Sequence, residues 1–335
     1  MDRAREKLNG VCRVCRVCDG FACRGEVPGF GGAGSGASFM NNVSALAAVK
    51  LNVRVLHGAS EPKTGTSLFG VDLKFPIIGA PVAGVRINRM AGVTERELAE
   101  AMICGPAMAG TLGSGGDGAV PEVFDSGLEM ISRRTAGRGG IVIIKPVSQE
   151  VIVEKIALAE KAGADAVGVD VDAAAFVNMT LAGRRVEPKT PKMISELVAA
   201  SRVPFIVKGV MSVADAEAAA EAGAAAVVVS NHGGRVIDHT PGTAEVLPEI
   251  SRAVRGKTKV LVDGGIRSGV DVLKMLALGA DAVLVGRPLA VAAIGGGAQA
   301  VKLRLERIGE ELKAAMIMTG CPDLGAVDTR VIRGR

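Results

Sequence analysis

Three stretches decide the fold: AGADAVGVDVD at 162–172, AGAAAVVVSN at 222–231 and LGADAVLVGRP at 278–288. Each copy follows a helix-like stretch rich in alanine and charged residues, such as SVADAEAAAEAG before the second copy. The glycine early in each copy suits the left-handed cap that ends a helix, and the β-branched run after it is typical of a buried strand. The phrase recurs at intervals of roughly 60 residues, which indicates a repeated structural unit.

Two further apolar runs, VPFIVKG at 203–209 and KVLVDGG at 259–265, lie between these copies. The true unit is therefore about 30 residues long, one strand and one helix, which is the size of a βαβ step. Continuing the pattern toward the N-terminus predicts eight strands, at 75–82, 106–113, 140–146, 164–172, 203–209, 224–231, 259–265 and 282–288. Eight such units predict an α/β fold, a closed (β/α)8 TIM barrel, and an open doubly wound sheet is the alternative.

The composition of the 335 residues favours buried parallel strands and excludes several kinds of function. Apolar residues make up 48% and charged residues 22%, and a chain with eight Phe and no Trp or Tyr fills its core with aliphatic side chains. Without tyrosine, no mechanism can use a tyrosine hydroxyl, and a nucleic-acid site built on aromatic stacking is excluded. The formal net charge of +5 is too small to indicate a nucleic-acid partner, and it is compatible with a small anionic organic substrate.

No segment indicates a membrane span or secretion. The longest uncharged run near the C-terminal end, PLAVAAIGGGAQAV, is short and interrupted by three glycines, so we expect no membrane span. The first residues, MDRAREKLNGVCRVC, lack the apolar core of a secretory signal, and we expect a cytoplasmic protein. We also expect the protein to form a homo-oligomer.

The cysteines near the N-terminus follow the pattern C-x2-C-x2-C-x4-C, at Cys12, Cys15, Cys18 and Cys23. Because no secretory signal accompanies them, metal binding is favoured over a disulfide framework. The spacing is close to the cysteine run of bacterial ferredoxins, so an iron–sulfur cluster is preferred to a tetrahedral zinc ion, and a metal-free thiol cluster stays open as the third interpretation. Residues 27–38, VPGFGGAGSGAS, are predicted to be a flexible linker, so that 1–38 forms a Cys-rich N-terminal extension and 39–335 the barrel.

Polar and charged residues gather at the carboxyl ends of the predicted strands, where a barrel keeps its active site. They are Lys145, Asp170, Asp172, Lys208, Ser230, His232, Arg235, Asp263, Gly264, Gly265, Gly286 and Arg287. Glycines follow the seventh and eighth strands, at 264–265 and at 286, and they let the backbone approach an anion. Arg267 and Arg287 supply positive charge beside them. This pattern predicts a phosphate site, and two tight turns with solvated arginines are the alternative.

Two stretches carry a family resemblance: VKGVMSVADAEAAAEAGAAAVVVSNHGGRVID from 207 and LVDGGIRSGVDVLKMLALGADAVLVGRPLA from 261. The segment SNHGGR, combined with DGGIR and GRP at these spacings, is highly specific. The sequence resembles the FMN-dependent α-hydroxy-acid oxidases and dehydrogenases, the glycolate oxidase and lactate oxidase family. The similarity is strong from 203 to 325 and weaker back to residue 50.

The resemblance implies FMN as the cofactor and the oxidation of a small 2-hydroxy acid by hydride transfer to flavin N5. His232 matches the family's catalytic base, Asp172 the aspartate that stabilises the protonated histidine, and Arg235 the arginine that holds the substrate carboxylate. Lys208 matches the lysine beside the flavin N1/O2 edge. The other cofactor-binding positions fall on Ala83, Ser230, Asp263, Gly264, Gly265, Arg267, Gly286 and Arg287.

The chemistry of these side chains agrees with the implied roles. A hydroxyl group is too weak an acid to lose its proton unaided, and a histidine, whose pKa lies near neutrality, is a suitable base. A carboxylate beside the histidine keeps one tautomer, and a fixed cation stabilises negative charge that develops on the cofactor. Because side chains alternate along a strand, Asp170 is expected to point to the opposite face from the site and is the weaker candidate.

The sequence departs from the family in its substrate contacts. The oxidases bind the substrate carboxylate and hydroxyl with tyrosines, whereas this chain has none, and the strand-three position of one of them aligns with Ile144. Lys145, the next residue, is predicted to supply part of the carboxylate clamp as a point charge. The substrate therefore need not be glycolate or lactate. Two other functions stay open: the chemistry of a type 2 isopentenyl diphosphate isomerase, and a sensor that binds flavin or metal without turnover.

The cysteine segment carries a further hypothesis. An iron–sulfur cluster near the barrel mouth would relay electrons from reduced FMN to an electron-acceptor protein. The protein would then be a dehydrogenase rather than an oxidase.

Overall fold

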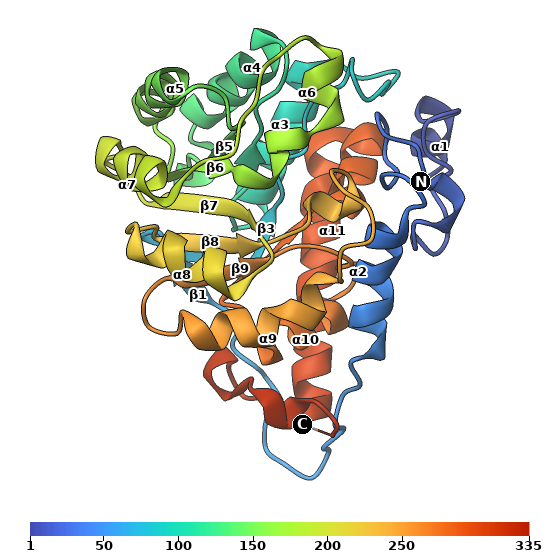
Figure 1. The fold of residues 1–335 in the computed structure, drawn as a ribbon. Coiled ribbons are helices and arrows are strands. Elements are labelled where there is room, and N and C mark those ends of the chain that lie inside the picture. The colour runs from blue at the N-terminus through green and yellow to red at the C-terminus, as the bar shows by residue number, and fades with distance from the viewer. Residues whose placement is uncertain (335) are drawn as a thin grey trace.

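Eight parallel strands form a barrel at the centre of the molecule (Figure 1). The computed structural model describes residues 1–334. The strands are β3 (Ile77–Gly79), β4 (Ser114–Gly115), β5 (Ile141–Ile144), β6 (Ala166–Asp170), β7 (Phe205–Val210), β8 (Ala226–Val229), β9 (Lys259–Val262) and β10 (Ala282–Val285). Their order in the sheet is β3-β10-β9-β8-β7-β6-β5-β4. A hydrogen bond of 2.9 Å from the Gly79 amide to the carbonyl of Leu112 spans the remaining gap, and the predicted TIM barrel is confirmed.

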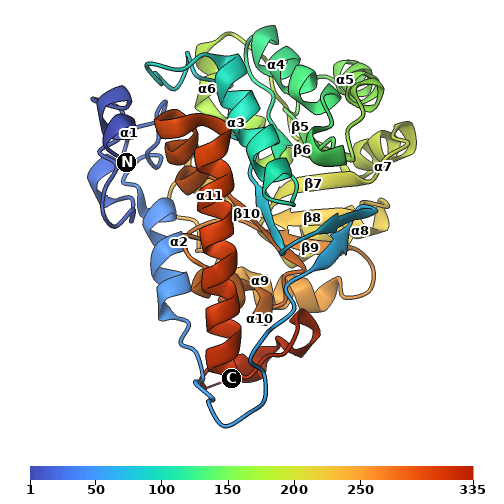
Figure 2. The same ribbon diagram turned by 180° about the vertical axis from the view of Figure 1, so that it is seen from behind.

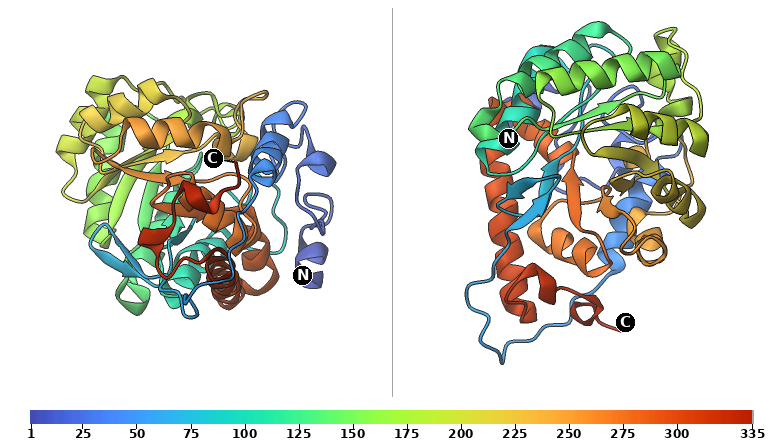
Figure 3. Two further views of the ribbon diagram at one scale, coloured as in Figure 1. Left: turned by 90° about the horizontal axis from the view of Figure 1, so that it is seen from below. Right: turned by 90° about the vertical axis from the view of Figure 1, so that its left-hand side faces the viewer.

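Helices follow the strands and cover the outside of the barrel, as the view from below in Figure 3 shows. They are α3 (Glu95–Met108), α4 (Pro121–Ser132), α5 (Gln149–Ala162), α6 (Val177–Leu181), α7 (Pro191–Ala200), α8 (Val213–Glu221), α9 (Thr243–Ala253), α10 (Gly269–Ala277) and α11 (Arg287–Thr319). The hydroxyls of Ser212 and Ser268 cap α8 and α10 by accepting from backbone amides in the first turn. Gly163 ends α5 with a φ of +87°, the left-handed cap that the repeated phrase predicts. Within residues 1–334, no helix is both long and apolar enough to span a membrane.

Aliphatic side chains fill the inside of the barrel. The interior cluster includes Ile78, Ile143, Ile206, Val228, Leu261 and Leu284. A short antiparallel hairpin of β1 (Thr66–Leu68) and β2 (Val71–Leu73) adds Leu68 and Leu73 to this cluster, and it is drawn in blue in Figure 2. The carbonyl of Asp72 in β2 accepts from Arg138, which precedes β5, so the hairpin covers the amino ends of the strands. The opposite end of the barrel, where the carboxyl ends of the strands lie, is not covered by this hairpin.

The N-terminal segment packs against the barrel. Helix α1 (Asp2–Lys7) contacts α11, and α2 (Ala37–Ala48) contacts α9. Residues 27–38, predicted to be a flexible linker, instead dock on the loop after β8: the Ala33 amide donates to the carbonyl of Gly234 at 2.8 Å. The linker prediction is wrong because the glycines serve close packing. A Cβ atom on Gly31, for example, would lie 1.9 Å from the carbonyl oxygen of Cys23.

One predicted strand is misplaced. Residues 106–108 form the last turn of α3, and the second barrel strand is Ser114–Gly115 rather than 106–113. The apolar run PAMAGTLG is mostly buried, apart from Met108, but a short buried run fits the end of a packed helix as well as a strand. Pro106 is tolerated in the last turn of the helix, so it did not mark the boundary. The other seven predicted strands overlap observed ones.

Candidate active site

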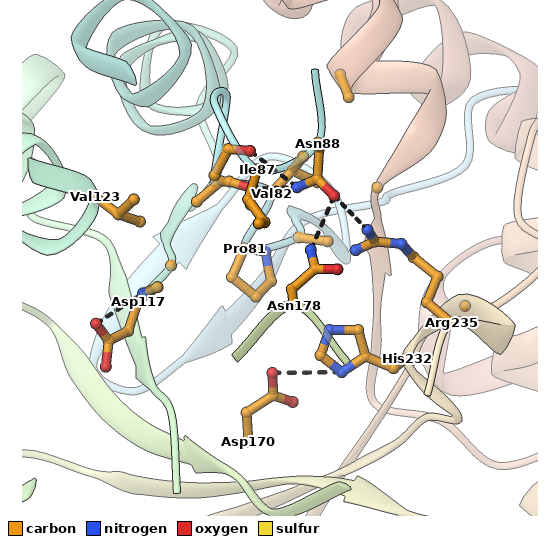
Figure 4. Close-up of a pocket in the computed structure, with 18 of the residues that line it drawn as sticks. Pro81, Val82, Ile87, Asn88, Asp117, Val123, Asp170, Asn178, His232 and Arg235 are labelled. Atoms are coloured by element: carbon orange, nitrogen blue, oxygen red, sulfur yellow. Dashed lines mark hydrogen bonds and ion pairs between the residues drawn. The ribbon is translucent and has the colours of Figure 1, made fainter. Parts of the chain in front are cut away.

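A cavity of about 360 Å³ opens at the carboxyl ends of the strands (Figure 4). Its volume is typical of small-molecule sites, which span about 300–1,000 Å³. Most of the predicted site residues line it, namely Ala83, Lys145, Lys208, His232, Arg235, Asp263, Gly264, Gly265, Arg267, Gly286 and Arg287. Apart from the four cysteines, the remaining two, Asp172 and Ser230, contact His232 through hydrogen bonds. The fold therefore brings the predicted residues together.

His232 begins a one-turn 3-10 helix (His232–Gly234) after β8. Its φ of +57° is unusual for a residue other than glycine, and such strain concentrates at functional sites. The backbone amide donates to Oγ of Ser230 at 3.1 Å, and ring atom Nδ1 lies 3.0 Å from Oδ1 of Asp172. The ring also packs on Phe176, with centroids 4.8 Å apart. Because Nδ1 is held by a carboxylate, Nε2 is the nitrogen available to a ligand.

Asp170 occupies the centre of the charged network, and the expectation that it points away is wrong. Its Oδ2 accepts from Nζ of Lys145 at 2.7 Å, and its Oδ1 accepts from Nζ of Lys208 at 3.0 Å. Oδ2 also lies 3.5 Å from Nδ1 of His232. Side chains two residues apart on a strand point to the same face, so the alternation itself groups Asp170 with Asp172, and the expectation misapplied it. Strand β6 ends at Asp170, and the chain then enters a 3-10 turn that holds Asp172. Both carboxylates therefore face the imidazole.

Burial and neighbouring charges set the protonation of this network. Burial alone would raise the pKa of Asp170, but His232 and the two lysines outweigh it and hold the pKa well below its ordinary value. The pKa of Asp172 is raised, by burial and by the charge of Asp170. Burial lowers the pKa of His232 well below 6.5, and nearby cations add to this effect while Asp170 opposes it. The imidazole is therefore neutral near pH 7 and can accept a proton.

Lys208 keeps its charge although it is buried. Burial lowers its pKa, but Asp170, Asp172 and Asp263 outweigh burial and raise the pKa above its ordinary value. Its Nζ also lies 3.2 Å from Oγ of Ser230, whose hydroxyl donates to Asp263 at 2.8 Å. The structure thus fixes a cation at the cavity wall.

The group formed by His232, Asp170 and Asp172 has the composition of a metal site. Single ligand atoms of the three residues lie within 4.8 Å of one another, and in the described part of the chain no other group of three His, Cys, Asp or Glu gathers as closely. However, the ammonium groups of Lys145 and Lys208 already occupy both oxygens of Asp170. Their charge opposes a metal cation, so the arrangement suits proton transfer better than metal binding.

Three half-buried arginines, Arg235, Arg267 and Arg287, form a positive cluster. Within residues 1–334, none of them forms an ion pair with a carboxylate, and Nε of Arg235 and of Arg267 has no hydrogen-bond partner. Burial, with the charges of the other two arginines, lowers the pKa of Arg287 to about 9. Burial lowers the pKa of Arg235 to about 10. Buried guanidinium groups without an anion are costly, so the cluster fits an anionic ligand.

The glycines beside this cluster hold the backbone where a side chain would not fit. Gly265 has a φ of +77°, and a Cβ atom on it would lie 2.4 Å from the carbonyl oxygen of Asn42 in α2. Gly264 has a φ of +98°, and its Cβ atom would lie 2.7 Å from Oγ1 of Thr243. Helix α11 begins at Arg287, so the positive end of its dipole lies at the same place. These features fit the phosphate group of FMN.

Phe176, Asn88 and Asn178 are among the cavity-wall residues that the sequence did not predict. Two cations lie near the Phe176 ring: Nζ of Lys145 and the guanidinium of Arg235 are each 5.1 Å from its centroid. The two asparagines are almost fully buried and hydrogen-bonded to each other at 3.0 Å. The available signal was position, because Asn88 follows β3 and the other two follow β6, at strand ends where a barrel keeps its chemistry.

The four N-terminal cysteines lie on a segment that touches the arginine cluster. Their side chains are half-buried, and Nη2 of Arg267 donates to the carbonyl of Cys18 at 3.1 Å and lies 3.6 Å from its Sγ. Burial raises the pKa of Cys23 to about 11, and the thiols of Cys18 and Cys12 contribute to that shift. No three of these sulfur atoms gather within 4.8 Å of one another.

Comparison with known proteins agrees with this geometry. The sequence profile of the FMN-dependent dehydrogenase family matches residues 30–194 and 178–334, so the N-terminal cysteines lie outside the match. The chain is 34% identical to 4-hydroxymandelate oxidase of Amycolatopsis orientalis, over 90% of this chain and 92% of that protein. It is 31% identical to 2-hydroxyacid oxidase 1 of Homo sapiens, over 90% of each.

Solved structures give the same result. A mandelate oxidase bound to benzoyl-formic acid superposes with a TM-score of 0.77 at 31% sequence identity, covering 99% of this chain and 96% of that one. A mandelate oxidase variant with an FMN adduct superposes with a TM-score of 0.74 at 32% identity, covering 99% of both chains. The family match, the relatives and the site together show that this chain belongs to the FMN-dependent dehydrogenase family.

Proposed function

We propose that this protein oxidises a small 2-hydroxy acid in an FMN-dependent reaction, with His232 as the base. The observation that carries this proposal is the state of His232: a buried, neutral imidazole held at Nδ1 by Asp172, beside a guanidinium that suits a carboxylate. The relatives named above, a 4-hydroxymandelate oxidase and a 2-hydroxyacid oxidase, support this substrate class.

The residues present fit FMN. The phosphate would be held by the arginine cluster and the glycine turns, that is by Gly264, Gly265, Arg267, Gly286 and Arg287, and the unpartnered Nε of Arg267 supports this assignment. Ala83, Ser230 and Asp263 would lie along the ring system, and Lys208 would place its fixed charge where negative charge develops. When bound, FMN supplies the acceptor for the hydride that leaves the substrate carbon.

His232 performs the proton transfer. Its Nε2 accepts the proton of the substrate hydroxyl, and the resulting imidazolium lies 3.0 Å from Asp172 and 3.5 Å from Asp170. These carboxylates stabilise the charged ring and keep its orientation. A positioned base of this kind contributes about 10²–10⁴-fold to the rate.

Arg235 would bind the substrate carboxylate. Its Nη2 is held by Asn88 at 2.7 Å and by the carbonyl of Gly29 at 2.9 Å, which orients the guanidinium and leaves Nε free. Lys145 was predicted to share this role. Because its Nζ is bound to Asp170, it would contribute positive charge near the substrate rather than a direct fork.

The proposal is tested by anaerobic addition of a panel of 2-hydroxy acids to the FMN-loaded protein, with flavin absorbance as the readout. We expect one or more of these acids to bleach the flavin. In His232→Gln, bleaching should slow by about 10²–10⁴-fold while the flavin stays bound. His239→Gln is the matched control, because that histidine is 79% exposed. Undiminished bleaching in His232→Gln would refute the assigned base, and no bleaching by any acid would favour a sensor without turnover.

For the N-terminal cysteines we propose an iron–sulfur cluster that passes electrons to an acceptor protein, which makes the enzyme a dehydrogenase. The support is the spacing of the four cysteines and the contact of their segment with Arg267. Four sulfurs on zinc would lie only about 3.8 Å apart, which the separated thiols fit less well than a larger cluster.

Anaerobic purification should give iron, acid-labile sulfide and absorbance beyond that of flavin, and a dye acceptor should reoxidise the reduced protein faster than O₂ does. Zinc or metal-free thiols would contradict the cluster. The homo-oligomer and the cytoplasmic location stay predictions.

A further inference from the structure

The cavity wall contains a buried hydrogen-bond acceptor that nothing in the described part of the chain satisfies. Asn178, in α6, is only 4% exposed and lines the cavity. Its Nδ2 donates to Oδ1 of Asn88 at 3.0 Å, but its Oδ1 is buried without a partner. Figure 4 shows the side chain among His232 and Arg235, with its nitrogen toward Asn88. An unpaired buried polar atom is costly, so this oxygen marks a place for a ligand donor.

The orientation of the Asn178 amide follows from its neighbour. Nδ2 of Asn88 donates to the carbonyls of Ala83 at 3.2 Å and Gly84 at 3.0 Å, and a carbonyl can only accept. The Oδ1 of Asn88 is therefore the atom that faces Asn178 and Arg235, whose Nη2 donates to it at 2.7 Å. Because that oxygen is an acceptor, Asn178 must present its NH₂ group to it. The oxygen of Asn178 is thus left for the cavity, and a flipped amide is excluded.

A second unpaired atom accompanies this acceptor. Nε of Arg235, a donor, is also buried without a partner, and Arg235 lines the same cavity. The proposed function gives this Nε to the substrate carboxylate, so Oδ1 of Asn178 remains for a donor on the neighbouring part of the substrate, such as a hydroxyl. A methyl group at this place would leave Oδ1 of Asn178 unpaired.

We propose that the substrate carries a second hydroxyl group, next to the one that is oxidised, which donates to Oδ1 of Asn178. This inference rests on the proposed function, because it assumes that His232 and Arg235 engage the 2-hydroxyl and the carboxylate. It narrows the substrate class to 2,3-dihydroxy acids and their larger relatives. The second hydroxyl binds and does not react.

The test compares glycerate with lactate, in both enantiomers of each, because the two acids differ by one hydroxyl at C3. We expect kcat/KM for flavin reduction to be about 10- to 100-fold higher with glycerate, since lactate leaves buried polar atoms unpaired. In Asn178→Ala this ratio should fall toward one. Leu181→Ala, at a position on α6 that is 63% exposed, should keep the ratio of the unmodified protein.

The outcomes separate this inference from the proposed function. If neither acid, nor any other 2-hydroxy acid, reduces the flavin, the proposed function fails first. If lactate matches or exceeds glycerate in the unmodified protein, the second hydroxyl is refuted without any variant. If Asn178→Ala slows both acids equally and preserves their ratio, Asn178 only positions Asn88 and Arg235, and the proposal is overturned.

Discussion

Replacing Asp170 with asparagine isolates the charge at the centre of the site. The substitution keeps the shape of the side chain but removes the anion between Lys145 and Lys208. Both lysine side chains are nearly buried, with 10% and 4% of their surface exposed, and their Nζ atoms lie 2.7 Å and 3.0 Å from the carboxylate. After the substitution, neither ammonium group can return to water without a change in the strands that carry it.

The expected cost follows from this burial. Removing one partner of a buried ion pair destabilises a protein by about 3–5 kcal/mol, because an uncompensated charge stays inside. Lys208 retains Asp263 at 3.7 Å and the hydroxyl of Ser230, so most of the cost arises at Lys145. We therefore expect about 3 kcal/mol in Asp170→Asn. At about 1–3 kcal/mol per molar urea, the unfolding midpoint should fall by about 1–3 M.

Urea unfolding of the FMN-loaded protein, followed by far-ultraviolet circular dichroism, measures this shift, because the chain has no Trp or Tyr to serve as fluorescent reporters. Glu310→Gln is the control: its ion pair with Lys313, at 3.0 Å, has 66% of the glutamate and 36% of the lysine side chain exposed. Such a pair contributes at most about 1 kcal/mol. A midpoint shift in Asp170→Asn no larger than that of the control would show that Asp170 does not balance a buried charge.

Three further outcomes are expected. The pKa of His232 is lowered, and the proposed base must be neutral to accept a proton. We therefore expect kcat/KM to fall as the pH drops through a value below 6.5. A fall in kcat/KM that is centred at or above pH 6.5 would contradict the burial of the ring. Gly265→Ala should lower Tm and release FMN. The control Gly70→Ala has a similar φ of +78° but open space around it, so it should show only the backbone strain of about 1–2 kcal/mol. Equal losses of stability in the two variants would show that close packing at Gly265 plays no role. Arg287→Ala should weaken FMN binding at least about tenfold. It should also expose the N-terminal segment to limited proteolysis, because Arg287 donates to the carbonyls of Phe30 and Gly31. Unchanged cleavage would count against the docking of this segment on Arg287.

The barrel was predictable because its unit is local. A glycine cap followed by a β-branched run identifies one strand wherever it occurs, and the run after Gly163 led to β6 without reference to the rest of the chain. The predictions failed at two segments whose structure is determined by packing against distant parts of the chain. The first three residues of PAMAGTLG end helix α3, which packs on α11, and the glycines of 27–38 were needed for contact with the loop at Gly234. Neither contact has a signature in the segment itself.

The candidate site divides in the same way. His232 and Lys208 were found because they stand at the ends of strands, a position that sequence periodicity gives directly. Asp170 was undervalued because the alternation of a strand was misapplied: Asp170 and Asp172 are two residues apart, and such side chains share one face. Asn88 and Asn178 were not found, since their role depends on amide orientations that arise only when residues far apart in sequence meet.

The absence of tyrosine changes how this cavity can hold a substrate. A tyrosine hydroxyl donates and accepts at one atom, whereas an asparagine amide separates the two functions between its ends. One N–H of Asn178 donates to Asn88, and its Oδ1 is the atom left without a partner. Lys145 cannot replace the missing donors freely, because Asp170 holds its ammonium group. In the proposed function, Arg235 would therefore be the principal donor for the carboxylate, and discrimination between acids would move to the hydroxyl groups beside it.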